Sequence, residues 1–443
     1  MKLIVCDRLC ESVAFYGELM KDKYYFKCIT CGKKYSPDEV TYLCPNCEKE
    51  NDGNQPPKGV LKTLYNYEKI RTRYKKHKLF DKLKEKEYRE LLPIKSERSL
   101  SFLKVGKTPL YDVSNLTSFK NLLSFKENPF HLFLKDDSQN PTFSFKDRAS
   151  DLVCAFAKEN GIDTIVAAST GNAGSSLAGI CASQNQKANI FVPASAPKAK
   201  LTQICMYGSQ LIPVDGTYDD AFELSIEATK KFGWYNRNTA YNPFTIEGKK
   251  IVAFEIFQQM KRELPDRVFV PVGDGCIISG VYKGFEDLLK LGLIDKIPTI
   301  IAVQSEKSDN IIRNLVSDKF ISKPSKTIAD SIAVDIPRNF WMTKKYIEEY
   351  KGEWIAVSDE EIISASKILS KNTGIFAEPA AAASFAGMLK YVKQEKNDGN
   401  SKNIVLLTGS GLKDLKAVQR IIEIPKAIKS LDEILPQINA DKR

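Results

Sequence analysis

The sequence predicts an α/β protein with mostly parallel sheets, helices on both sheet faces, and a small cysteine-rich module at the start. Three observations support this fold class. From about Gly106 onwards, short β-branched apolar segments alternate with amphipathic segments of helical period. The apolar segments are continuous, which is typical of strands buried on both faces. Two Cys-x-x-Cys pairs lie within the first 58 residues.

The chain of 443 residues is long enough for more than one domain. We expect a metal-stapled module over 1–58, a basic helical connecting segment over 59–105 and a catalytic domain over 106–443. A smaller subdomain is expected to be nested within that domain at about 150–235. The 43% hydrophobic content is that of an ordinary globular protein, and no apolar run reaches membrane-span length. The first residues lack a signal-peptide core, so we expect a cytoplasmic protein without a membrane partner.

The cysteine module contains Cys28, Cys31, Cys44 and Cys47 as two pairs in knuckle-like turns. Two such pairs in a short polar segment favour a closed, structural zinc site, similar to a zinc ribbon, over a redox pair. Cys6 and Cys10 have no assignment.

The connecting segment carries most of the net charge of +11. Between Val60 and Lys107 there are 15 Lys and Arg against six Asp and Glu. A solvated helical face explains this excess better than nucleic-acid binding, because no reader motif accompanies it. Within it, Phe80–Leu92 has helical apolar spacing, and Pro93 is expected to end the helix.

The alternating region yields strands and helices in order. The expected strands are His131–Leu134, Thr164–Ala168, Ala188–Val192, Gln210–Val214, Arg267–Val272, Thr299–Val303 and Asn403–Leu407. The expected helices include Asp147–Glu159, Ala173–Gln184 and Asp219–Phe232. In parallel sheets, ligands bind at the carboxyl ends of the strands. We therefore expect functional residues directly after each strand.

Lys146 is the first candidate at a strand end. It lies between two phenylalanines in Asn140-Pro-Thr-Phe-Ser-Phe-Lys-Asp-Arg148, at the start of an expected helix. Burial against aromatic rings lowers the pKa of a lysine and suits it to Schiff-base chemistry. Asp147 and Arg148 are interpreted as a local ion pair that fixes the helix start.

Four further strand ends are rich in glycine or polar side chains. They are Ser169–Ser176, Asn238–Lys249, Val272–Gly280 and Leu407–Asp414. The glycines at 273, 275 and 280 precede a helix and predict a phosphate cradle, but they do not match the dinucleotide fingerprint. Together with Lys146, an amide side chain and a late hydroxyl, they predict pyridoxal phosphate as the cofactor.

These motifs resemble the fold-type-II pyridoxal-phosphate enzymes, which have the two-domain tryptophan synthase β-like fold. They are most similar to the threonine synthases, some of which carry a zinc-ribbon-like module. The resemblance runs from Gly106-Lys-Thr-Pro-Leu110 to Asp414. It implies a lyase that converts O-phosphohomoserine and water to threonine and phosphate by β,γ-elimination and replacement. A homodimer is also implied.

The resemblance further implies residue roles. Lys146 would be the Schiff-base lysine and the general acid and base. Asn172 would contact the cofactor 3′ oxygen, and Thr408 its pyridine nitrogen. Gly273, Asp274, Gly275, Cys276 and Ile277 would hold the cofactor phosphate. Substrate would be bound by Ser169, Thr170, Asn238 and Thr239.

The chain departs from the family pattern at three positions. Thr245 stands where an arginine usually binds the substrate phosphate, Ser410 replaces a histidine, and Asp274 replaces an asparagine. Arg237, Lys249 or Lys198 could supply the missing cation. The departure at Thr245 keeps one alternative open, another enzyme of this fold: a serine or threonine dehydratase or a cysteate-synthase-like enzyme acting on phosphoserine. A further alternative is a non-catalytic regulator whose zinc module and basic helix bind nucleic acid, but Lys146 argues against it.

Overall fold

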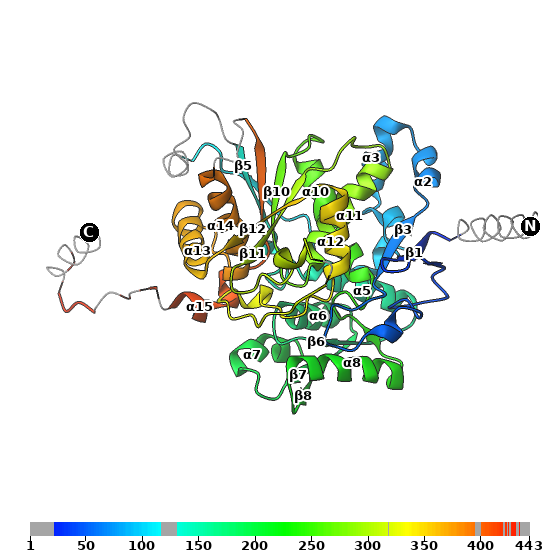
Figure 1. Cartoon of the computed structure of the whole chain (residues 1–443), viewed down its shortest axis with the longest axis horizontal. Helices are drawn as coiled ribbons and strands as arrows, with labels where there is room; N and C mark the ends of the chain where they lie inside the picture. The colour runs from blue at the N-terminus through cyan, green and yellow to red at the C-terminus, as the bar shows by residue number, and fades with distance from the viewer. Residues whose placement is uncertain are drawn as a thin grey trace, which may run out of the picture.

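The computed structural model describes residues 22–116, 131–317, 319–394, 400–419, 421–422, 424, 427–430 and 434. Cys6 and Cys10 lie outside these residues. None of the described helices is long and apolar enough to cross a lipid bilayer. The described chain forms three sheets, two of them large enough to be covered by helices (Figure 1).

The larger sheet has the strand order β12-β11-β10-β13-β5-β4. Neighbouring strands in this sheet pair in parallel, except that β4 is antiparallel to β5. Its strands are β4 (Leu110–Asp112), β5 (His131–Asp136), β10 (Arg267–Pro271), β11 (Thr299–Ser305), β12 (Glu353–Val357) and β13 (Lys402–Leu407). The expectation of mostly parallel strands is confirmed.

Helices cover both faces of this sheet, as the continuous apolar strands require. Phe269 of β10 packs in the cluster that contains α13 (Asp359–Thr373) and α14 (Pro379–Lys393). Its neighbours Val268 and Val270 point to the other cluster, with α10 (Ile251–Gln259) and α11 (Cys276–Lys290). Figure 1 shows α13 and α14 on one side of the strands, and α10, α11 and α12 (Phe340–Glu349) on the other.

The second sheet has the order β8-β7-β6-β9, with every pair parallel. Its strands are β6 (Thr164–Ala168), β7 (Lys187–Pro193), β8 (Gln210–Val214) and β9 (Tyr235–Asn236). Its helices are α6 (Asn172–Ser183), α7 (Lys198–Met206) and α8 (Tyr218–Phe232). A capping box of Thr217 and Asp220 starts α8, and Gly233 in the left-handed region ends it. Helices α5 (Asp147–Glu159) and α9 (Phe244–Lys249) pack against each other; α5 also contacts α6 of the smaller sheet, and α9 contacts α11 of the larger one.

The third sheet belongs to the N-terminal region, drawn in blue in Figure 1. It pairs β1 (Tyr24–Cys28) with β2 (Lys34–Tyr35) and β3 (Leu61–Tyr65), all antiparallel. The basic segment thus contributes a strand before its helices α2 (Tyr67–Arg73) and α3 (Lys76–Glu85).

The helix expected to reach Leu92 ends seven residues earlier, at Glu85. Glu87 and Tyr88 have positive φ angles of 48° and 55°, which interrupt the helix. A short 3₁₀ turn, η2 (Arg89–Leu91), follows. The other 3₁₀ turns and the last described helix are η1 (Glu48–Glu50), η3 (Glu97–Ser99), η4 (Asp137–Gln139), η5 (Ile312–Asn314), η6 (Asp330–Ile332), η7 (Gly411–Lys413) and α15 (Leu415–Gln419).

Candidate active site

One cavity brings together residues from seven separate parts of the chain. It lies where β6, β10 and β13 end and where α5, α6, α11 and α14 begin. Its walls are formed by Lys146, Asn172, Thr239, Gly273, Asp274, Gly275, Cys276, Ile277, Ser331, Ile332, Glu378, Ala380 and Thr408. Nine of the twelve cofactor- and substrate-binding residues expected from the sequence are therefore in one place: Lys146, Asn172, Thr239, Gly273–Ile277 and Thr408.

Lys146 precedes the first residue of α5 and has helical backbone angles. Burial lowers the pKa of its amine, and the positive charge of Arg237 lowers it further. Phe145 beside it is fully buried. A larger neutral fraction makes the Lys146 amine a stronger nucleophile and base than an exposed lysine.

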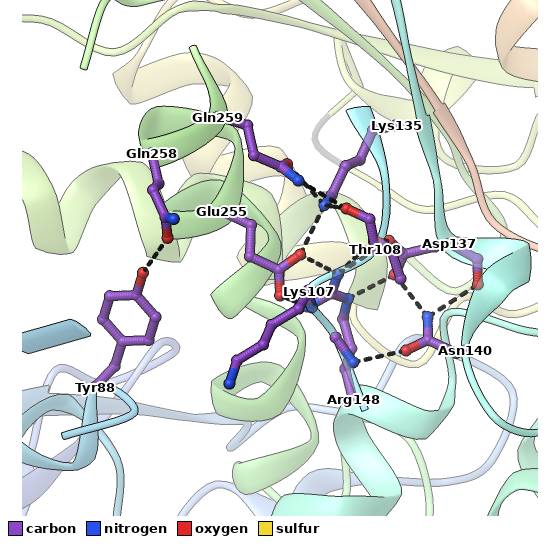
Figure 2. A network of polar contacts seen from close by, with 11 residues as sticks. Tyr88, Lys107, Thr108, Lys135, Asp137, Asn140, Arg148, Glu255, Gln258 and Gln259 are labelled. Atoms are coloured by element: carbon purple, nitrogen blue, oxygen red, sulfur yellow. Dashed lines mark hydrogen bonds and ion pairs between the residues drawn. The ribbon is translucent and has the colours of Figure 1, made fainter. Parts of the chain in front are cut away.

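A buried ionic network fixes the helix start that carries Lys146 (Figure 2). Arg148 pairs with Asp137 at 2.5 Å and with Glu255 at 2.7 Å, and Lys135 pairs with Glu255 at 2.7 Å. Asp147 is not the partner of Arg148. Instead it accepts hydrogen bonds from the backbone N–H of Thr142 at 2.7 Å and from its hydroxyl at 2.5 Å. Arg148 thus ties this helix start to Asp137 and to Glu255 of α10, and Asp147 ties it to the preceding loop.

The segment Gly273–Ile277 forms a tight turn at the start of α11. Gly275 has φ +83°, and a Cβ there would lie 2.2 Å from Thr343 Oγ1. A Cβ on Gly273 would lie 2.8 Å from the Cα of Ile332. The first turn of α11 has no side-chain cap, so its N–H groups are available to an anion. Asp274 Oδ1 accepts from the backbone N–H of Arg338 at 3.0 Å, so this oxygen is engaged away from the turn.

Glu378 is a cavity residue that the sequence reasoning missed. It immediately precedes α14, and Pro379 is the first residue of that helix. Both carboxylate oxygens accept from Asn172 Nδ2 at 3.0 Å. Burial raises the pKa of Glu378 to about 7. The available signal was Glu-Pro before an alanine-rich segment, which is typical of a helix start.

Of the four residues expected to bind substrate, only Thr239 lines the cavity. The amide of Asn238 does not reach the cavity, because it accepts from Ala168 N–H and donates to Ser225 Oγ. Ser169 and Thr170 form the turn before α6, where Ser169 Oγ accepts from Gly171 N–H. The start of α6 has no side-chain cap.

The departures at 245 and 410 are explained locally. The buried Thr245 hydroxyl donates to the carbonyl of Asn242 at 2.8 Å and adds no charge. Ser410 Oγ accepts from Leu412 N–H at 3.3 Å at the start of η7. Of the three candidate cations, Arg237 and Lys249 are buried, and Lys198 is exposed at the start of α7.

The four cysteines expected to bind metal form one cluster. All four Sγ atoms lie within 4.8 Å of one another, with 3.8 Å between Cys28 and Cys47 and between Cys31 and Cys44. Four sulfurs at about 2.3 Å from a tetrahedral ion are separated by about 3.8 Å. Disulfide sulfurs would be about 2 Å apart. The cluster therefore has the geometry of a four-thiolate metal site.

The cavity fits pyridoxal phosphate in its donor set. It offers a primary amine for the aldehyde, an uncapped helix start for the phosphate, and amide and hydroxyl side chains for the ring.

A groove lined by the N-terminal loop at Asn51–Gly53, by α8 and by Arg338 also reaches Thr239, a residue that it shares with the cavity.

Comparisons with known proteins agree with this fit. Residues 102–409 match the family described as pyridoxal-phosphate dependent enzyme. The chain is 36% identical over 421 residues to threonine synthase of Methanocaldococcus jannaschii, covering 93% of this chain and 98% of the relative. It is 33% identical over 414 residues to threonine synthase of Methanosarcina acetivorans, covering 91% and 96%.

Solved structures share the fold at lower identity. Threonine deaminase isoform 2 from Solanum lycopersicum superposes with a TM-score of 0.62 at 21% identity, covering 74% of this chain and 90% of that one. Maize serine racemase superposes with a TM-score of 0.60 at 23% identity, covering 72% and 92%.

Proposed function

Because the chain belongs to the pyridoxal-phosphate dependent enzymes and, within them, to the threonine synthases, we propose that its cavity converts O-phosphohomoserine and water to threonine and phosphate. The observation that carries this proposal is the convergence of Lys146, Asn172, Gly273–Ile277 and Thr408 on one cavity from widely separated positions in the chain.

The cofactor would be held by residues of four elements. Lys146 would bind it covalently through Nζ, and the N–H groups at the start of α11 would bind its phosphate. Asn172, whose amide is oriented by Glu378, would donate to the 3′ oxygen. Thr408, at the end of β13, would meet the ring nitrogen. The uncapped start of α6, with Ser169 and Thr170, would receive the substrate carboxylate. The amide of Asn238, which is bonded to Ala168 N–H and Ser225 Oγ, would fix the segment that carries Thr239.

Bound pyridoxal phosphate supplies an electron sink for a carbanion next to the amino group. The protein supplies proton transfer. Lys146 Nζ, freed when the substrate amine takes its place, would remove one proton each from Cα and Cβ and return one proton each to Cγ and Cα. The Cγ–O bond to phosphate would break, the hydroxyl of water would bond to Cβ, and the remaining proton of water would go to the released phosphate. The lowered pKa of Lys146 keeps part of its amine neutral for this task.

We further propose that the four cysteines bind one structural zinc ion, supported by the sulfur spacing. The division into 1–58, 59–105 and 106–443, with a subdomain at about 150–235, is proposed together with it.

We also propose a cytoplasmic homodimer. The eight described cysteines form no disulfide, which suits a reducing compartment, and the dimer rests on the family resemblance.

The test is turnover by the purified protein loaded with pyridoxal phosphate. Phosphate and threonine should appear in equal amounts from O-phosphohomoserine, and Lys146→Ala should abolish both the activity and the absorption of the bound cofactor. Phosphate without threonine, or turnover of phosphoserine alone, would instead favour a dehydratase or a cysteate-synthase-like enzyme.

A further inference from the structure

Two buried cations beside the cavity differ from every other buried cation in the described part of the chain. Four are paired with carboxylates within 4 Å, namely Lys135, Arg148, Lys250 and Lys283. Arg237 and Lys249, which are 1% and 0% exposed, have no carboxylate within that distance among the described residues. Burying an uncompensated charge is unfavourable, so such positions favour an anionic ligand.

Arg237 reaches the base of Lys146. Its Nη2 donates to the Lys146 carbonyl and its Nη1 to Thr239 Oγ1, both at 3.4 Å, and its Nε donates to Ser150 Oγ at 3.1 Å. All three acceptors are neutral, and two of the bonds are long. A guanidinium has five N–H donors, so Arg237 retains capacity for a stronger, charged acceptor.

Lys249 has no hydrogen-bond partner for Nζ. It lies at the end of α9, and its Cβ would be 2.6 Å from a Cβ placed on Gly280 of α11, one turn beyond Cys276. Burial and the charges of Arg237 and Lys146 lower the pKa of Lys249 to about 7. The positive charges of Arg237 and Lys146 thus repel that of Lys249. An anion among them would reverse that repulsion.

The anion has a definite chemical class. The cofactor phosphate already has the uncapped α11 start, and the substrate of the proposed reaction carries a second phosphate. Thr245, where the family usually has an arginine, donates its hydroxyl to Asn242 and brings no charge. We propose that Arg237 and Lys249 together bind the phosphate group of the substrate and of the inorganic phosphate product. This inference rests on the proposed function for the identity of the phosphoester.

The experiment uses inorganic phosphate on the cofactor-loaded enzyme, so that it does not depend on turnover. Lys249→Met removes the charge and retains the length of the side chain, and Lys249→Arg restores the charge. Lys198→Met, at an exposed lysine of α7, is the matched control. Thermal unfolding is measured with and without phosphate, alongside the cofactor absorption spectrum.

We expect phosphate to raise the melting temperature of the native enzyme and of Lys198→Met, and to leave that of Lys249→Met unchanged. The cofactor spectrum should be the same in all variants. With O-phosphohomoserine, Lys249→Met should raise KM at least tenfold, and Lys249→Arg should recover most of that loss. Arg237→Gln should behave as Lys249→Met does.

Equal stabilisation by phosphate in Lys249→Met and in the native enzyme would overturn the proposal. Loss of the bound cofactor in Lys249→Met would also overturn it, because the cation would then serve the cofactor phosphate. If Lys249→Met fails to fold, Lys249→Gln provides the same comparison. A native enzyme that binds phosphate through Lys249 but does not turn over O-phosphohomoserine would refute the proposed reaction and leave the anion site standing.

Discussion

Asn172 Nδ2 donates to both carboxylate oxygens of Glu378 at 3.0 Å, across the cavity from α6 to the start of α14. The bifurcated contact fixes the amide plane of Asn172. It also buries a carboxyl group whose charged form is disfavoured, since burial raises the pKa of Glu378 to about 7. This pair therefore links cavity geometry to pH.

Glu378→Gln should stabilise the cofactor-free protein above pH 7. The pKa of Glu378 is raised on folding, so its contribution is fully favourable below about pH 4.5 and is lost as pH rises to about 7. The advantage of Glu378→Gln should therefore grow over that window, to roughly 3 kcal/mol, and then level off. Urea unfolding at several pH values measures it. Glu227→Gln, at an exposed position of α8, is the control, and parallel pH profiles for all three proteins would contradict the prediction.

Lys249 should give the opposite slope. Its pKa is lowered on folding to about 7, so the unfolded chain binds more protons between pH 7 and about 10.5. The native protein should gain stability relative to Lys249→Met as pH rises through that range, by at most about 1.4 kcal/mol per pH unit. Urea unfolding of both proteins without phosphate at pH 7, 8 and 9 checks this. A constant difference between them would show that Lys249 stays protonated in the folded state up to pH 9, and would contradict the lowered pKa.

Gly275→Ala should disrupt the cradle at the start of α11. A Cβ there would lie 2.2 Å from Thr343 Oγ1, in addition to the cost of a positive φ. Gly292→Ala has a similar φ of +68° with nothing within 4 Å, so it carries the backbone cost alone. We expect both variants to lose roughly 1 kcal/mol from the backbone, and only Gly275→Ala to lose pyridoxal phosphate on dialysis. Retention of the cofactor by Gly275→Ala would argue against this turn as its phosphate site.

Arg148→Met should destabilise the protein by about 3–5 kcal/mol, because it leaves Asp137 and Glu255 buried without their main partner. Burial alone would raise the pKa of Glu255, but the charge of Arg148 outweighs burial and lowers this pKa to about 2. The stabilisation of the folded state by this ion pair is present above about pH 4.5 and disappears as pH falls towards 2. Urea unfolding at pH 7 and pH 4 measures both effects. Arg262→Met removes an exposed ion pair with Asp81 and should cost under about 1 kcal/mol.

Cys31→Ser should remove a bound metal ion. Metal analysis is expected to find one zinc per native chain and less in Cys31→Ser, with a lower melting temperature, since three thiolates bind zinc less tightly than four. Cys205→Ser, also at an exposed cysteine but on α7, should retain the metal. A native protein free of zinc and insensitive to chelators would refute the assignment.

The strands could be predicted closely because their signal is local. Thr164–Ala168 and Gln210–Val214 are observed with the expected bounds, and Asp147–Glu159 is a helix as expected. β12 escaped prediction because Glu353-Trp-Ile-Ala-Val357 lies at a sheet edge, where exposure relaxes the apolar pattern. The early end of α3 depends on positive φ angles at Glu87 and Tyr88, which helical periodicity does not encode.

The cavity could be predicted only where it follows strand ends. Lys146, Asn172 and Thr408 meet because each comes shortly after a strand of a parallel sheet. Glu378 does not follow a named strand, and its position depends on α14 packing against the sheet. The sequence offers Arg237 as one of three candidate cations, but whether a buried cation is paired depends on tertiary contacts, which sequence patterns do not encode.

The position of β13 has a consequence for biosynthesis. The last strand of the larger sheet lies between β10 and β5, so its neighbours remain apart until Lys402–Leu407 has left the ribosome. The smaller sheet uses only residues 164–236 and can close long before that. Strand edges of the larger sheet therefore stay unpaired through most of translation. A nascent chain with such exposed edges is prone to aggregate and benefits from chaperones.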